Sequence, residues 1–275
     1  MSVYKSDKAA FLDRSLHSVW TQQTLKPNQI VLVEDGWLPD ELQAVICEWK
    51  DRLGDQLVLC FNENNLGLTK SLNKGLQIIH SDYVARMDSD DMSVSTRFEK
   101  QVSFLNTHPD IDIIGGASQE FDEDHECLNV RHYPLTHEEV KKYILKANPL
   151  AHSSVTMRTR IFENGLKYDE RFRMTQDLRL WYDAILEGYK IANLPDICVY
   201  FRRQGEMFKR RRKTTWDEFK IYVNGIYRMK GLFTTSYRFP IGRLFFRNMP
   251  RSWVRRIYSS PIRQIILEKK QKKKE

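Results

Sequence analysis

Along the first 120 residues, short apolar runs alternate with longer amphipathic segments. The short runs are almost continuously apolar, which predicts buried strands over 29–34, 57–61, 83–87 and 111–115. Between them, apolar residues recur at helical spacing, which predicts helices over 11–20, 39–53, 69–79 and from Ser93 or Ser95 to about 106. This alternation indicates an α/β fold whose mostly parallel sheet is flanked by helices in right-handed crossovers.

The pattern is less regular over 121–175 and then becomes clear again. Thr136 and Glu139 form a capping box, which predicts that a helix begins there. Further predictions are a loop and strand over 148–160, a helix over 175–187, a loop and strand over 193–203, and a helix over 215–229.

The length suits one large domain or one domain with an appendage. Of the 275 residues, 41% are hydrophobic and 29% are charged, which is enough apolar material for a core. No apolar run approaches the roughly 18 residues of a spanning helix, and the N-terminal segment lacks the basic-then-apolar order of a signal peptide. The cysteines are too scattered for a zinc ribbon or a CxxC redox site and fit reduced thiols in a cytoplasmic protein: Cys47, Cys60, Cys127 and Cys198.

The net charge of +8 divides unevenly along the chain. From Phe201 to Glu275 there are 22 Lys and Arg against 5 Asp and Glu, whereas residues 1–200 have a net charge of −9. A basic segment in which Arg alternates with Phe, Trp and Ile is typical of an interfacial helix on anionic lipid. Nucleic-acid binding and a merely solvated tail are the alternatives, although no nucleic-acid motif is present. We expect an enzyme domain over 1–203 and a basic, amphipathic helical tail over 204–275.

Three aspartates directly follow the predicted strand over 83–87. They are Asp88, Asp90 and Asp91. The carboxyl ends of parallel strands face the crevice where open α/β sheets bind ligands, and paired carboxylates suit Mg²⁺ or Mn²⁺. The alternative is an acidic loop that caps the next helix.

Two further groups of residues follow predicted strands. Glu34, Asp35 and Gly36 end the predicted strand over 29–34, where an aspartate can bond a nucleobase or ribose, although Asp-Gly is also a common turn. The segments 65–67 and 71–75 contain glycines near a helix start, for which a turn or close packing is the simpler explanation.

Taken together, these motifs resemble family 2 glycosyltransferases. MSVYKS, VEDG, NNLGLTKSLNKGL, ARMDSDD, NPLAHSSV and QDLRLW occur in the order in which that family has forms such as SVYN, VDDGS, NxGLxxALNxGL, ARMDADD, NPxxHPSV and EDYDLW. The resemblance covers about residues 1–203. It implies a GT-A (Rossmann-like) fold, an inverting reaction, a nucleotide-diphosphate sugar and a divalent metal, Mn²⁺ or Mg²⁺.

The resemblance also implies roles for individual residues. Asp177 matches the general base, and Asp90 with Asp88 matches the metal-binding pair, Asp88 also being a candidate for the ribose. The other matches are Ser2, Val3, Tyr4 and Asp35 for the donor nucleotide, and His152, Trp181, Arg202 and Lys70 for the acceptor or phosphates.

The chain departs from the family pattern in several places. Gln176 replaces the usual Glu before the base, Glu34 replaces the first Asp of the nucleotide motif, and Leu72 stands where the family often has an arginine. Only Met1–Tyr4 is available for the first strand, so this strand is either clipped or begins upstream.

The expected reaction is attack of an acceptor hydroxyl on the donor's anomeric carbon, with Asp177 as base and the metal offsetting charge on the leaving UDP. The chain most resembles β-1,3-galactosyltransferases that extend GlcNAc-diphosphate-undecaprenol in O-antigen synthesis, peripheral on the cytoplasmic face of the bacterial inner membrane. No nucleic-acid partner is expected. The alternatives are a UDP-glucose-dependent enzyme of the same pathway, and a non-catalytic membrane- or nucleic-acid-binding protein. A nucleotidyltransferase is disfavoured, because no glycine-rich loop follows the first strand.

Overall fold

The computed structural model describes residues 1–122, 128–203 and 214–249. Of the predicted basic tail over 204–275, the structure therefore describes only residues 214–249. Of the cysteines, Cys47, Cys60 and Cys198 are free thiols, and Cys127 is not among the described residues.

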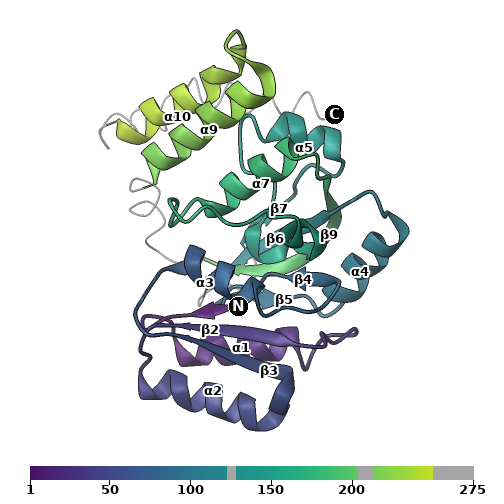
Figure 1. The fold of residues 1–275 in the computed structure, drawn as a ribbon, viewed down its shortest axis with the longest axis vertical. Helices are drawn as coiled ribbons and strands as arrows, with labels where there is room; N and C mark the ends of the chain where they lie inside the picture. The colour runs from purple at the N-terminus through teal and green to yellow at the C-terminus, as the bar shows by residue number, and fades with distance from the viewer. Residues whose placement is uncertain (123–127, 204–213, 250–275) are drawn as a thin grey trace.

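The N-terminal part is a three-stranded parallel sheet covered on both faces by helices. The strands lie in the order β1-β2-β3: β1 (Ser2–Val3), β2 (Ile30–Asp35) and β3 (Leu57–Asn62). Figure 1 shows two helices below this sheet, α1 (Ala9–Val19) and α2 (Asp40–Leu53), and one above it, α3 (Leu68–Leu76). A 3₁₀ turn, Gly54–Gln56, connects α2 to β3. The predicted parallel strand–helix alternation is confirmed here.

The second sheet is mixed, and it follows the first along the chain. Its order is β4-β8-β6-β9-β5, with β7 added to β6. Only β6 and β9 run parallel, and their long pairing contains register shifts at Gly116–Ser118. The strands are β4 (Tyr83–Ala85), β5 (Met92–Ser93), β6 (Ile113–Phe121), β7 (Val130–Arg131), β8 (Thr156–Arg158) and β9 (Ile191–Arg202).

The remaining helices cover this second sheet and extend away from it (Figure 1). Thr136 caps α5 through a complete capping box with Glu139, as predicted. α4 begins after Thr96, so neither Ser93 nor Ser95 caps it; Ser93 lies in β5 instead. The elements are α4 (Arg97–Thr107), α5 (His137–Tyr143), η2 (His152–Ser154), α6 (Arg160–Glu163), α7 (Gln176–Leu186), α9 (Thr215–Lys230), η3 (Thr235–Tyr237) and α10 (Arg238–Asn248).

Two hydrophobic cores hold these layers together. One lies between the first sheet and its helices and includes the fully buried Trp49. The larger core joins α5, α7 and α9 to β6 and contains Trp181, Tyr182 and Tyr222. α9 approaches α7 closely, because a Cβ added to Gly225 would lie 2.3 Å from the ring of Tyr182. Any larger residue at 225 would push the two helices apart.

No helix in the described ranges combines the length and the hydropathy that crossing a membrane requires.

Candidate active site

An acidic cluster follows β4 near the middle of the molecule. Asp88, Asp90 and Asp91 each have a carboxylate oxygen within 4.8 Å of the others. Asp91 is only 1% exposed; its Oδ1 accepts the backbone N–H of Arg202 at 2.8 Å, and its Oδ2 has no hydrogen-bond partner among the described residues. Burial raises the pKa of Asp91 well above its usual value, and the charges of Asp88 and Asp90 raise it further. The cluster therefore needs positive charge.

Buried arginines supply part of that charge. Arg86 is 5% exposed and forms an ion pair in which its two terminal nitrogens donate to both oxygens of Asp88. Arg202 donates from Nε to the carbonyl oxygen of Asp90 at 3.0 Å, and its guanidinium packs 3.7 Å from the ring centroid of Phe11. In the structure Arg202 thus stabilises the backbone of the acidic loop. Its expected phosphate contact stays a prediction.

Arg97 stabilises the same segment through the backbone. It is 1% exposed and donates to the carbonyl oxygens of Arg86 at 2.9 Å and Val155 at 3.0 Å. Desolvation of the buried guanidinium lowers the pKa of Arg97 to about 10. The acidic loop is therefore held in place by side chains from β9, α4 and its own strand.

The donor set fits a hard divalent cation. Three carboxylates lie within reach of one another, and one buried carboxylate oxygen of Asp91 has no partner in the described part of the chain. Mg²⁺ and Mn²⁺ prefer oxygen ligands of this kind.

The first sheet contributes a fourth carboxylate that the sequence reasoning missed. Asp7 lies between β1 and α1, and its Oδ2 accepts the N–H of Tyr4 at 3.1 Å and the Ser89 hydroxyl at 2.8 Å. Burial raises the pKa of Asp7 to about 6; its two hydrogen bonds oppose the shift, and Asp90 and Asp88 add to it. Asp7 therefore ties the β1–α1 loop to the acidic loop.

The residues predicted for the donor nucleotide differ in accessibility. Val3 is fully buried in the core, Ser2 is half-buried, and Tyr4 is 43% exposed. Among these three, only the side chain of Tyr4 is well placed to meet a ligand, and the roles of all three stay predictions.

Asp35 lies at the end of β2 and organises the start of α3. Its Oδ1 accepts the Leu66 N–H at 2.7 Å and the Asn62 amide at 3.0 Å, and its Oδ2 accepts the Gly67 N–H at 2.9 Å. Gly67 has a φ of +87°, a conformation that favours glycine. These hydrogen bonds hold the 65–67 segment against the end of β2. Nucleobase binding by Asp35 stays a prediction.

On α3, Lys70 is exposed, whereas Asn73 is half-buried. The Asn73 amide donates to the Tyr168 carbonyl at 2.9 Å and accepts the Tyr168 N–H at 3.0 Å. This reciprocal pair fastens α3 to the segment before α7. Sequence reasoning had no partner for Asn73, which lies 95 residues from Tyr168.

Asp177 lies in the first turn of α7, as predicted. Its Oδ2 accepts the Asn148 amide at 2.6 Å. Burial raises the pKa of Asp177, while hydrogen bonds from Leu178 and Asn148 and the charge of Arg86 partly oppose that shift. The charge of Arg86 acts on both Asp88 and Asp177, so both carboxylates lie within electrostatic range of the same guanidinium.

His152 and Trp181 lie next to each other, and their expected place near the acceptor stays a prediction. His152 Nε2 lies 2.8 Å from the hydroxyl of Tyr168, and its ring stands edge-on to Trp181 at 6.0 Å between centroids. Burial lowers the pKa of His152 well below its usual value, so it is neutral at physiological pH. Trp181 is fully buried in the larger core, so its acceptor role stays a prediction. Tyr168, which the sequence reasoning did not select, connects α3, His152 and the neighbourhood of Arg86.

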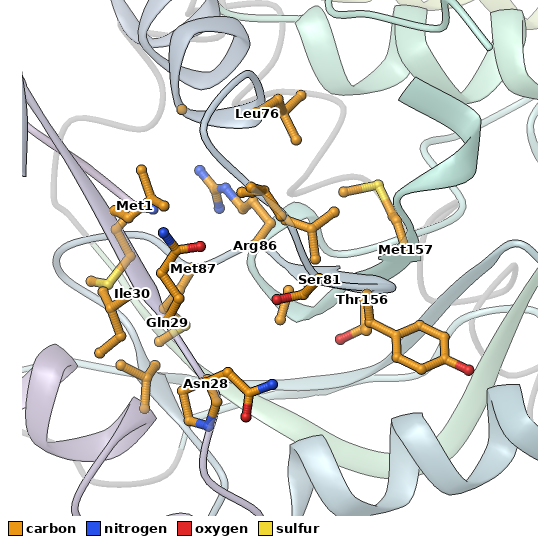
Figure 2. A pocket seen from close by; sticks show the side chains of 18 of the residues that line it. Met1, Asn28, Gln29, Ile30, Leu76, Ser81, Arg86, Met87, Thr156 and Met157 are labelled. Atoms are coloured by element: carbon orange, nitrogen blue, oxygen red, sulfur yellow. Dashed lines mark hydrogen bonds between the residues drawn. The ribbon is translucent and has the colours of Figure 1, made fainter. Parts of the chain in front are cut away.

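A cavity of about 510 Å³ adjoins the site between β2, α3 and β4. Figure 2 shows Arg86 and Met87 among largely apolar neighbours such as Ile30, Leu76 and Met157. None of the three clustered aspartates lines it. The cavity is therefore a gap between the two sheets rather than the space that the acidic cluster faces.

The structure thus combines a strand-end acidic cluster with a half-buried carboxylate, Asp177, on an α/β scaffold. Residues 1–166 match the family model "Glycosyl transferase family 2". The chain is 36% identical over 253 residues to an amylovoran biosynthesis glycosyltransferase, AmsE, of Erwinia amylovora, covering 91% of this chain and 92% of that protein. The chain belongs to glycosyltransferase family 2.

More distant similarities agree with this family. The chain is 27% identical to a UDP-Gal:α-D-GlcNAc-diphosphoundecaprenol β-1,3-galactosyltransferase of Escherichia coli, covering 97% and 96% of the two chains. The fold is similar to that of the mannosyltransferase PcManGT from Pyrobaculum calidifontis, solved with GDP-Man and Mn²⁺ (TM-score 0.62, 13% identity, 92% and 70% coverage). It is also similar to S. aureus TarS 1–349, solved with UDP-GlcNAc (TM-score 0.59, 16% identity, 91% and 81% coverage). The expected GT-A fold is confirmed.

Proposed function

We propose that the protein is an inverting glycosyltransferase that moves galactose from UDP-galactose to a GlcNAc-diphosphate-undecaprenol acceptor, forming a β-1,3 linkage in O-antigen or related polysaccharide synthesis. The observation that carries the proposal is the cluster of Asp88, Asp90 and Asp91 after β4, with Asp177 within electrostatic range of Arg86, the partner of Asp88. The donor, acceptor and linkage follow the Escherichia coli relative, with UDP-glucose as the competing donor.

Asp177 is the general base of this proposal. A base must be ionised and lie within hydrogen-bond reach of the acceptor hydroxyl. The Asn148 amide favours the ionised form and fixes the orientation of one oxygen, Oδ2. Burial raises the pKa of Asp177, which strengthens the carboxylate as a proton acceptor. One displacement at the anomeric carbon then inverts an α-linked donor to a β-glycoside.

Asp90 and Asp88 would hold a divalent cation, Mn²⁺ or Mg²⁺. When bound, such a cation offsets the negative charge that develops on the leaving diphosphate. The donor nucleotide would lie against Ser2, Val3, Tyr4 and Asp35. The phosphates or the acceptor would lie near His152, Trp181, Lys70 and Arg202.

A membrane-bound acceptor requires a surface that meets lipid, and the α9–α10 hairpin has suitable chemistry. Leu232 is 66% exposed and Phe233 fully exposed at the turn between the helices, and Phe245 on α10 is 69% exposed. Basic residues accompany them, among them Lys230 and Arg238. This combination fits the anionic cytoplasmic face of the inner membrane. α10 also connects to the site, because its Arg243 and Arg247 pair with Glu218, whose charge acts on Asp177.

The test is release of UDP from a panel of UDP-sugars with a GlcNAc-diphosphate-lipid acceptor, in Mn²⁺ and in EDTA. Release from UDP-galactose alone, dependent on metal and on acceptor, supports the proposal, and release from UDP-glucose alone selects the competing donor. Turnover that persists in EDTA contradicts the metal assignment. Sedimentation with anionic and with neutral vesicles tests the membrane surface, and Phe233→Asp should weaken binding to anionic vesicles.

A further inference from the structure

Arg86 stands out among the buried arginines around the acidic cluster. Its guanidinium is paired with a carboxylate of the cluster itself, occupying both oxygens of Asp88. Arg97 donates to backbone carbonyl oxygens, and Nε of Arg202 donates to the carbonyl oxygen of Asp90. Nε of Arg86 has no hydrogen-bond partner within residues 1–122, 128–203 and 214–249.

This pairing sets up a competition for Asp88. A divalent cation that uses the Asp88 carboxylate must share or displace the Arg86 ion pair. A displaced guanidinium, 5% exposed, would remain buried without its anion, which is strongly unfavourable. A cation that arrives alone therefore binds against the cost of unpairing Arg86.

A diphosphate removes that cost, because guanidinium groups bind phosphate oxygens in bidentate fashion. We propose that Arg86 is a positioning residue that exchanges the Asp88 carboxylate for the diphosphate of the donor, and so makes cation and nucleotide binding cooperative. The exchange rests on the proposed function, because the diphosphate belongs to the proposed donor. The competition between Arg86 and a cation for Asp88 does not depend on that function. The charge of Arg86 also interacts with Asp91 directly before β5, Tyr168 before α7, Asp177 on α7 and His152 in η2.

The proposal predicts opposite effects on two binding steps. In Arg86→Gln the Asp88 carboxylate has no resident cation, so Mn²⁺ alone should bind about fivefold to tenfold tighter than to the unmodified chain. UDP should also raise the Mn²⁺ affinity of Arg86→Gln by a factor at least about tenfold smaller than in the unmodified chain. The reason is that coupling between the two ligands is reciprocal, and Arg86, which links the two binding steps, is absent. Arg86→Lys keeps the charge without the bidentate fork and should fall between the two.

The experiment measures free Mn²⁺ by electron paramagnetic resonance on the full chain, with and without UDP, alongside thermal unfolding. The matched control is Arg158→Gln, a β8 arginine that bonds the carbonyl oxygens of Ile111 and Leu105. It should lower the melting temperature without changing either Mn²⁺ measurement.

Weaker Mn²⁺ binding in Arg86→Gln without UDP, or an unchanged UDP enhancement, would overturn the proposal and leave Arg86 a structural ion pair. If Arg86→Gln does not fold, Arg86→Lys decides by the same two measurements. If the unmodified chain binds Mn²⁺ but not UDP, the donor assignment fails. The Mn²⁺-only comparison then still decides whether Arg86 competes for Asp88.

Discussion

Around Asp88, Asp90 and Asp91 the protein places buried arginines, whereas the side-chain hydrogen bond to Asp177 comes from the neutral amide of Asn148. The cluster has several like charges in one place and is stabilised by Arg86 and Arg202 from either side. Asp177 has one hydrogen-bonding amide, from Asn148, and a pKa raised by burial. The guanidinium groups of the first environment supply positive charge, whereas the burial that raises the pKa of Asp177 suits a group that takes up a proton.

The largest expected effect comes from removing the proton acceptor. Asp177→Asn keeps the size of the side chain but cannot accept a proton, so we expect kcat to fall about 10³-fold or more. Mn²⁺ and UDP affinity should stay unchanged, which calorimetry checks. Asp183→Asn on the same helix is the control, because Asp183 pairs with Arg179 and should affect stability alone. A loss of Mn²⁺ binding in Asp177→Asn would mean that the two environments are not distinct.

A substitution in the acidic cluster should instead weaken Mn²⁺ binding, which Asp177→Asn leaves unchanged. Asp90→Ala removes a carboxylate from the group that lies within 4.8 Å, so Mn²⁺ affinity should fall about 100-fold and activity with it. Raising the Mn²⁺ concentration should restore part of the activity. Asp55→Ala, at an exposed aspartate in the 3₁₀ turn before β3, should change neither. Full activity of Asp90→Ala in EDTA would contradict the cation site.

A smaller effect should appear in the pH profile. The Asn148 amide favours the ionised form of Asp177, so Asn148→Ala should raise the Asp177 pKa further. Because the ionised form is the active base, the acidic limb of the kcat profile should move to higher pH, with a loss of a few fold at neutral pH. The exposed Asn164 supplies the control variant Asn164→Ala. A limb that does not move would exclude Asp177 as the titrating base.

The smallest effect concerns stability at Asp7. Its pKa is raised to about 6 in the folded chain, so its ionisation destabilises the fold as pH rises from about 4 through 6. Asp7→Asn should therefore raise the melting temperature at pH 7.5 by roughly 2–4 °C, about 1 kcal/mol, and have little effect at pH 4. Scanning calorimetry at both pH values checks this, and an equal shift at both would rule out the electrostatic cause. Saturating Mn²⁺ should reduce the difference.

The local elements were largely predictable. The strands over 29–34 and 57–61 correspond to β2 and β3, and the helices over 39–53 and 175–187 correspond to α2 and α7. Their apolar periodicity depends on residues close together in the chain, so it can be recognised in a single sequence. The second sheet was less predictable, because its antiparallel pairings join segments such as β4 and β8 that are far apart in the chain.

Among the candidate site residues, the sequence determined which residue types are present and in what order. The acidic motif, Asp35 and Asp177 follow strand ends or begin a helix, and local rules place such residues. The supporting contacts could not be found this way, since Asp7 meets Ser89 82 residues away and Asn148 meets Asp177 29 residues away. No spacing rule applies to partners so distant.

By itself, then, the sequence determined the α/β alternation and the acidic motif, because both depend on the order of adjacent residues. Only the tertiary structure decided that Arg86 pairs with Asp88, that Asp7 accepts a hydrogen bond from Ser89 in the acidic loop, and that Asn148 bonds Asp177. These outcomes depend on burial and on charge, and both are fixed only when distant segments pack together and exclude water.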